Sequence, residues 1–139
     1  MTRAMILAAA VAGSVASLAL AATQQPGGLS QAMGGLWEVS GVPGAKAPVR
    51  QCFGSVGLLA QFEHRTKSCT RKVTSENAAS TVIDYSCGGA GFGRTKVDVL
   101  TPRSLRLETQ GISDNLPFNY VLQARRVGDC ATSQSASRH

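Results

Sequence analysis

Apolar and polar residues alternate along most of the chain after residue 34, as expected for strands that bury one face. The pattern is clearest over residues 80–87, where Thr81, Ile83 and Tyr85 share one face and mainly polar residues occupy the other. Similar alternation predicts strands over residues 34–40, 49–53, 69–74, 94–100, 104–111 and 118–126. The chain is therefore expected to form a mainly antiparallel β domain of about six or seven strands, curved into a half-barrel or small sandwich.

One segment departs from this period of two. Val56, Leu59 and Phe62 are spaced three apart, and Ser55 stands where a helix N-cap would. The pattern predicts a single short helix within residues 55–64, which would cover one face or opening of the sheet.

Turn-forming residues separate the predicted strands. Loops or turns are expected over residues 42–48, 75–78, 101–103 and 112–117. The glycine-rich stretch 87–93 superficially resembles a phosphate-binding loop, but such loops lead into a helix, whereas the residues that follow alternate like a strand. A sharp turn or a bulge is the expected role of these glycines.

The first part of the chain has the layout of a secretory signal peptide. Arg3 precedes an uncharged run over residues 4–22, which is rich in small residues and ends with the Ala-x-Ala cleavage pattern Ala19-Leu20-Ala21. The competing interpretation is a membrane-spanning helix, since the run is about long enough to cross a bilayer. Cleavage after residue 21 would leave a flexible lead-in over residues 22–33, one domain over residues 34–130, and a disordered tail over residues 131–139.

The charge of the chain agrees with export to the periplasm or beyond the cell. Without Arg3, 13 basic residues remain against 8 acidic ones, so the mature chain is moderately basic. An exported protein would not normally meet nucleic acid. The surplus of basic residues therefore indicates either binding to an anionic envelope polymer or simply a soluble surface.

The chain has only seven aromatic residues, so its core is expected to be thin and to need covalent support. Its four cysteines, an even number in an exported chain, predict two disulfides. Their spacing is too wide for a four-cysteine zinc site or a redox pair, so no cofactor is expected. Four cysteines allow three pairings, and we expect Cys52 to pair with Cys69 and Cys87 with Cys130. The first bridge would clamp the short helix to its flanking strands, and the second would tie the last strand to the glycine turn.

A family resemblance rests on three features of this sequence. These are the Gly35-Leu36-Trp37-Glu38 motif, a cysteine at the end of the next strand, and the later Cys87-Gly88-Gly89. With them the chain resembles a bacterial exported family catalogued as domain of unknown function 3617, over about residues 34–130. The resemblance implies an exported location and brings no catalytic residues.

The most catalytic-looking pair is Glu63-His64, because a histidine beside a carboxylate can act as a general base. Adjacent helical residues point in different directions, however, and Arg65 and Lys67 favour a solvated helix end. No serine motif or obvious carboxylate pair supports hydrolysis. Two groups of basic residues, Arg65/Lys67/Arg71/Lys72 and Arg125/Arg126, would form a stripe only if their segments lay together.

Three functions remain open from the sequence alone. The leading hypothesis is a non-enzymatic envelope module that binds an apolar or anionic ligand, or an envelope protein, in a concavity lined by Trp37, Ile83, Leu107 and Tyr120. The second is a small hydrolase that acts through His64. The third is a purely structural or protein-interaction module, which a filled interior would favour.

Overall fold

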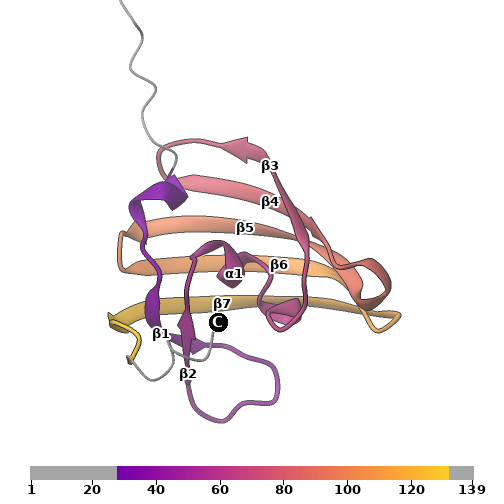
Figure 1. Ribbon diagram of the computed structural model, residues 1–139, viewed down its shortest axis with the longest axis horizontal. Coiled ribbons are helices and arrows are strands. Elements are labelled where there is room, and N and C mark those ends of the chain that lie inside the picture. The colour runs from indigo at the N-terminus through magenta and orange to yellow at the C-terminus, as the bar shows by residue number, and fades with distance from the viewer. Residues whose placement is uncertain (1–27, 132–139) are drawn as a thin grey trace, which may run out of the picture.

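Seven antiparallel strands form one unclosed sheet in the computed structural model, which describes residues 28–131 (Figure 1). The strands are β1 (Gly35–Ser40), β2 (Val49–Phe53), β3 (Thr70–Glu76), β4 (Ser80–Ser86), β5 (Gly91–Thr101), β6 (Ser104–Ser113) and β7 (Leu116–Gly128). The expectation of a mainly β fold with a curved antiparallel sheet is confirmed, and its form is a single sheet. The predicted signal peptide and nearly all of the predicted tail lie outside the described residues.

The strand order is β2-β1-β7-β6-β5-β4-β3, so β3 to β7 follow one another as hairpins and β1 pairs with β7 as well as with β2. In Figure 1, β1 and β2 lie at the lower left next to β7, and the short helix α1 (Gly57–Ala60) lies in front of β5 and β6. The sheet therefore has an inner face, which is turned toward α1, and an outer face.

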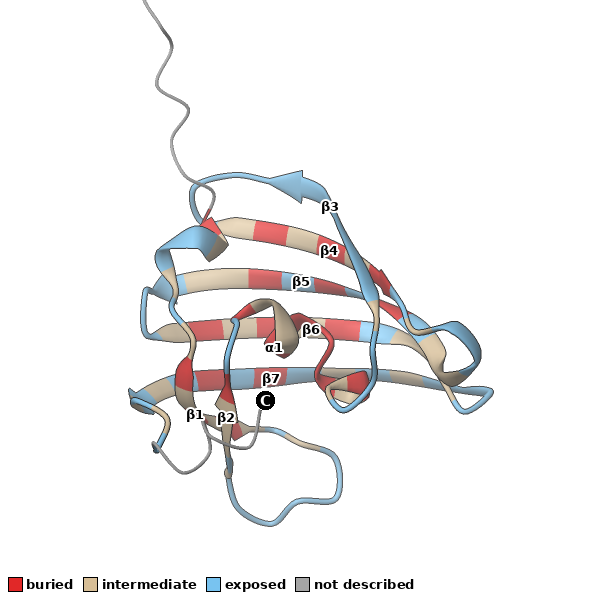
Figure 2. Ribbon diagram, in the orientation of Figure 1, coloured by how far each residue is buried: buried red, intermediate tan, exposed pale blue. Residues whose placement is uncertain are grey.

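The core occupies the inner face. Buried and exposed positions alternate along β4 to β7, as the banded strands of Figure 2 show. Residues of α1 and its neighbours fill the space in front of the sheet. The buried hydrophobic residues include Trp37, Val39, Phe53, Leu59, Phe62, Ile83, Val97, Leu105, Leu107 and Leu122.

The predicted helix over residues 55–64 is shorter than expected. One α-helical turn, α1, is followed by the 3-10 turn η2 (Phe62–His64), with Gln61 between them at φ −104° and ψ 37°. The apolar spacing was read correctly, because Val56, Leu59 and Phe62 are all buried.

The prediction of a loop over residues 112–117 is wrong. β6 continues to Ser113 and β7 begins at Leu116, so only Asp114 and Asn115 connect them. Both have positive φ, 48° and 66°, as a two-residue type I′ hairpin turn requires. Asp and Asn tolerate this backbone conformation better than most residues do.

The expected lead-in ends in ordered structure. Gly28–Gln31 forms the 3-10 helix η1, and the Gly28 amide donates to the Asn77 carbonyl over 2.9 Å. A side chain on Gly28 would lie 2.9 Å from the Ala78 carbonyl oxygen, so glycine permits this close approach to the β3–β4 turn. This turn is itself held by the Asn77 side chain, which accepts from the amides of Ala79 and Ser80.

The expected disulfide pairing is wrong. Cys52 pairs with Cys130, and Cys69 pairs with Cys87. The reason is the strand order: β2 lies next to β1, whose Leu36 is opposite both Cys52 and Gly128, so the end of β7 reaches β2. Cys69 and Cys87 flank the β3–β4 hairpin and meet at its open end. Two disulfides indicate an oxidising compartment outside the cytoplasm.

Candidate functional site

The four residues expected to line a concavity lie on the inner face, but three of them are core. Trp37, Ile83 and Leu107 are at most 3% exposed, and the Trp37 ring nitrogen donates to the Met33 carbonyl. Tyr120 is partly buried and packs against the same core. The inner face of the sheet is thus filled by protein side chains at these positions.

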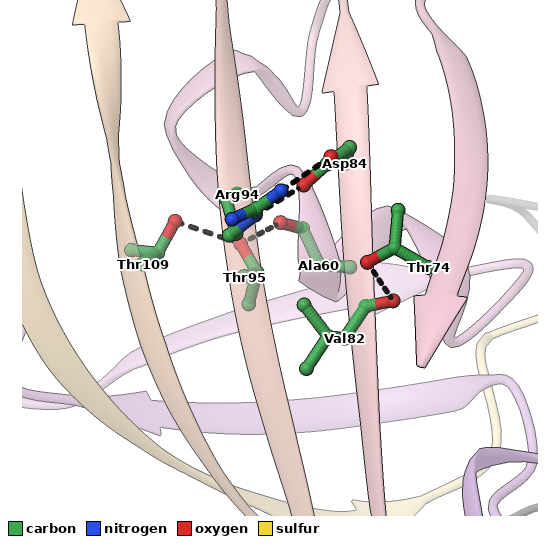
Figure 3. Close-up of polar contacts among 7 residues, drawn as sticks. All are labelled: Ala60, Thr74, Val82, Asp84, Arg94, Thr95 and Thr109. Atoms are coloured by element: carbon green, nitrogen blue, oxygen red, sulfur yellow. Dashed lines mark hydrogen bonds and ion pairs between the residues drawn. The ribbon is translucent and has the colours of Figure 1, made fainter. Parts of the chain in front are cut away.

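Hydrogen bonds from the sheet hold α1 in this position. The Thr95 hydroxyl of β5 donates to the Ala60 carbonyl over 2.5 Å and lies 2.8 Å from the Thr109 hydroxyl of β6 (Figure 3). Both threonines are buried. The last carbonyl of α1 therefore has a partner on the sheet, and α1 is fixed over the inner face.

Gln61 fixes the segment that follows α1. Its buried amide nitrogen lies within hydrogen-bond distance of the Lys67 carbonyl, the His64 carbonyl and the Cys69 sulfur. Its amide oxygen accepts from the Arg71 guanidinium. One side chain thus joins α1 to the start of β3, which explains a fully buried glutamine.

His64 is buried rather than at a solvated helix end, since only 3% of it is exposed. Its Nδ1 lies 3.2 Å from the Tyr85 hydroxyl, and its Nε2 lies 3.0 Å from the Ala90 carbonyl oxygen. A carbonyl only accepts, so Nε2 carries the proton and Nδ1 accepts from Tyr85. Both ring nitrogens are then occupied by the protein itself.

Glu63 does not act on His64. Its carboxylate accepts from the Tyr120 hydroxyl over 2.7 Å. Burial raises the pKa of Tyr85 to about 12, and burial followed by the hydrogen bond to Glu63 raises the pKa of Tyr120. The Glu63-His64 pair is therefore two separate contacts that connect η2 to β4 and β7.

Tyr85, Gly93, Gly111 and Phe118 lie in register across β4 to β7. The two glycines leave room for the rings beside them, because an added Cβ would lie 2.5 Å from the Tyr85 hydroxyl at Gly93 and 3.0 Å from Phe118 at Gly111. His64 packs edge-on against both rings. These aromatic side chains close this end of the inner face.

The outer face carries a hollow of about 640 Å³ over the same two glycines. Most of its side chains come from outward positions of β4 to β7. Its lining consists of Asp84, Tyr85, Phe92, Gly93, Arg94, Gln110, Gly111, Ile112, Phe118 and Asn119. Phe92 is 54% exposed there, although it is a large aromatic residue.

A row of polar side chains crosses the sheet beside this hollow. The outward residues Asp84, Arg94, Gln110 and Asn119 lie opposite one another on β4, β5, β6 and β7; we call them the polar row. Arg94 donates to both carboxylate oxygens of Asp84, over 2.6 and 2.8 Å (Figure 3). These hydrogen bonds hold the pKa of Asp84 below its usual value, so the pair stays ionised near neutrality.

The polar row separates two hollows of the outer face. A second hollow of about 360 Å³ shares Arg94, Gln110 and Asn119 with the first. Beyond it lies a ladder of ion pairs in which Lys96 and Arg106 contact Asp98, and Arg106 also contacts Glu108. Alternation on single strands indicated the outward side chains, but only the strand register shows that they form a row.

The predicted basic stripe does not form. β3, which carries Arg71 and Lys72, is separated from β7, which carries Arg125 and Arg126, by three strands. Several of these cations also have partners inside the protein, such as Glu38 for Arg125 and the Gly34 carbonyl for Arg126. Within residues 28–131, these two groups of basic residues therefore lie on separate parts of the sheet.

A third hollow, of about 480 Å³, lies between η1, the residues that precede α1, and the β3–β4 hairpin. Its apolar lining includes Leu29, Val56 and Val73, and Arg71 lies at its side. It marks the gap between the two edges of the unclosed sheet.

Among the described residues, 28–131, no group of three or more metal-ligating side chains is found, and no helix has the length and apolar character of a membrane span. No protein-family model matches the chain. The search of curated proteins and the search of solved structures likewise found no match. Arguments about function therefore rest on the outer hollow and the closed inner face.

Proposed function

We propose that this protein is a non-enzymatic binding module of the bacterial cell envelope, and that its ligand binds in the hollow on the outer face. The observation that carries the proposal is the position of Phe92. More than half of this residue is exposed, beside Ile112 and next to the polar row. An exposed aromatic residue among convergent polar groups is characteristic of a binding site.

The location of the protein belongs to the same proposal. Two disulfides are consistent with the periplasm or with secretion, to which the predicted cleaved signal peptide over residues 1–21 would direct the chain. Membership of the exported family marked by Gly35-Leu36-Trp37 remains a prediction, and it would agree with this location.

The surroundings of His64 favour a binding module over a hydrolase. A general base needs a ring nitrogen within reach of the substrate. The two nitrogens of His64 face Tyr85 and Ala90, and the ring is buried beneath Tyr85 and Phe118. Its position supports a structural role, in which it attaches η2 to the glycine-rich turn.

The packed inner face does not favour the predicted ligand site at Trp37, Ile83 and Leu107, since these residues are buried. A ligand on the inner face would have to displace α1 and its hydrogen bonds to Thr95. A ligand on the outer face leaves these hydrogen bonds in place.

Pelleting with isolated cell envelopes tests the proposal. We expect the labelled protein to sediment with envelopes, and Phe92→Ser to weaken this binding by about tenfold, because the ring supplies the apolar contact. The matched control is Val127→Ser, since Val127 is an exposed residue of β7 outside the hollows. Failure of the wild-type protein to bind envelopes would contradict the proposed function, and equal binding by Phe92→Ser would contradict the proposed site.

A further inference from the structure

We propose that the ligand of the outer hollow is a neutral glycan chain, an inference that rests on the proposed function. It follows from three properties of the hollow and the polar row: their charge balance, their unpaired amides, and the apolar side chains beside them.

The outer face of β4 to β6 carries almost no net charge. Its cations Arg94, Lys96 and Arg106 are matched by an equal number of carboxylates, and each of these cations contacts one of them. Lys72 on the edge strand adds one cation near Asp84. A polyanion would find its potential partners already neutralised, so this surface favours an uncharged ligand.

Gln110 and Asn119 supply hydrogen-bonding groups without charge. They lie opposite each other on β6 and β7, and both are exposed. Within residues 28–131, neither side-chain amide has a hydrogen-bond partner. An amide both donates and accepts, as a sugar hydroxyl does, so two adjacent amides suit a ligand rich in hydroxyl groups.

The Asp84–Arg94 pair extends this polar surface. Two hydrogen bonds fix the plane of the guanidinium, and both groups remain on the surface of the sheet. The guanidinium has further N–H donors, and a carboxylate can accept more than one hydrogen bond at each oxygen. The pair therefore offers oriented donors and acceptors to ligand hydroxyls.

Phe92 and Ile112 supply the apolar part of the site. They are opposite each other on β5 and β6 and lie one row away from the polar row. A sugar ring presents C–H groups on its face and hydroxyls at its rim, so it matches an aromatic ring beside planar polar groups. A lipid chain would instead require an enclosed apolar cavity, whereas this hollow is open and bordered by charged residues.

The length of the polar row favours a chain over a single sugar. It crosses four strands, which corresponds to about 14 Å at the usual spacing between strands. Several sugar rings in succession would be needed to contact the whole row.

NMR titration of the full mature protein distinguishes the possible ligands. The probes are chitohexaose and maltohexaose as neutral glycans, dextran sulfate as a polyanion, and phosphatidylglycerol vesicles as a lipid surface. We expect at least one neutral glycan to shift the side-chain amide signals of Gln110 and Asn119. Gln110→Ala and Asn119→Ala should each weaken its binding by about tenfold. The matched control Gln123→Ala, an exposed glutamine on the outer face of β7 outside the hollows, should leave the affinity within about twofold.

Binding of neither neutral glycan would overturn this inference. So would binding of dextran sulfate or vesicles at the hollow, or a neutral glycan whose affinity is unchanged in Gln110→Ala and Asn119→Ala. In these cases the envelope pelleting of wild-type and Phe92→Ser protein still decides the proposed function by itself. The wild-type protein and the variants Gln110→Ala, Asn119→Ala and Gln123→Ala should show the same urea unfolding midpoint. Loss of the fold is then excluded as the cause of weaker binding.

Discussion

At the scale of single residues, Thr95 and Thr81 illustrate how similar buried groups differ in their contribution to stability. Both are threonines that point to the inner face from neighbouring strands, and both are at most 1% exposed. The Thr95 hydroxyl bonds to Ala60 and Thr109. Within the described part of the chain, the Thr81 hydroxyl has no hydrogen-bond partner.

We therefore predict opposite outcomes for the same substitution at these two positions. Thr95→Val leaves the Ala60 carbonyl and the Thr109 hydroxyl without this partner, and should lower the free energy of unfolding by about 1–3 kcal/mol. Thr81→Val removes a desolvated hydroxyl and replaces it with a methyl group, so stability should stay equal or rise. Urea unfolding followed by the fluorescence of Trp37 measures both. A loss at Thr81 as large as that at Thr95 would contradict the hydrogen-bond assignment.

The two tyrosines of the chain provide a pH-dependent test of the aromatic end of the inner face. Burial raises the pKa of Tyr85 to about 12, and it also raises that of Tyr120. Because the folded protein holds these protons more tightly than the unfolded chain, their contribution to stability is complete below about pH 10 and is lost as the pH rises through 12.

Absorbance at 295 nm should accordingly show little tyrosinate in the folded protein at pH 10. In guanidinium chloride the same titration should have its midpoint at about pH 10. The free energy of unfolding should begin to fall above pH 10. A midpoint near 10 in the folded protein would show that Tyr85 and Tyr120 are solvated, contrary to this structure.

Alternation in the sequence predicted inward side chains correctly, as Thr81, Ile83 and Tyr85 of β4 show. It could not show which residues of different strands are neighbours. The polar row was missed for this reason, because Arg94, Gln110 and Asn119 come from three strands whose register is set by the whole sheet.

At the scale of elements, the two disulfides close the sheet differently. Cys52–Cys130 connects β2 with the end of β7 and spans 78 residues, whereas Cys69–Cys87 closes a hairpin and spans 18. The mistaken pairing assumed that each bridge would close around the short helix or the glycine turn. It neglected β1, which pairs with both β2 and β7 and so brings distant cysteines together.

Loop length predicts which bridge contributes more. In the chain-entropy model, the longer loop corresponds to about 4.5 kcal/mol and the shorter to about 3 kcal/mol. The double variant Cys52→Ser/Cys130→Ser should therefore be less stable than Cys69→Ser/Cys87→Ser in urea unfolding. Peptide mapping without reduction provides the control, and a fragment that joins Cys52 to Cys69 would contradict the observed pairing.

The sequence predicted the strands better than the segments between them. The β6–β7 turn was read as a six-residue loop because Asp114-Asn115 is a weaker hairpin signal than Asn-Gly or Asp-Gly. The helix was overestimated because Gln61, which ends α1, forms its hydrogen bonds with residues 64–71, and these partners cannot be read from local spacing.

At the scale of the whole molecule, the curved sheet packs around the segment that connects β2 to β3. The chain between β2 and β3 lies in front of the inner face and fills it with Leu59, Ala60 and Phe62 (Figure 2). Sequence reasoning predicted the curvature and a helix over the sheet, and it left open whether the interior would be filled. We therefore place the proposed binding site on the outer face.

In the proposed complex, the ligand contacts the outer face at the polar row and Phe92, while the inner face remains packed core. Cross-saturation NMR tests this arrangement, with deuterated protein and sonicated, protonated envelope fragments that are irradiated selectively. We expect signal loss at Phe92, Arg94, Gln110 and Asn119, with Thr95 and Leu107 unaffected. Signal loss centred on Leu29, Val56 and Val73 instead, at the gap between the sheet edges, would contradict it.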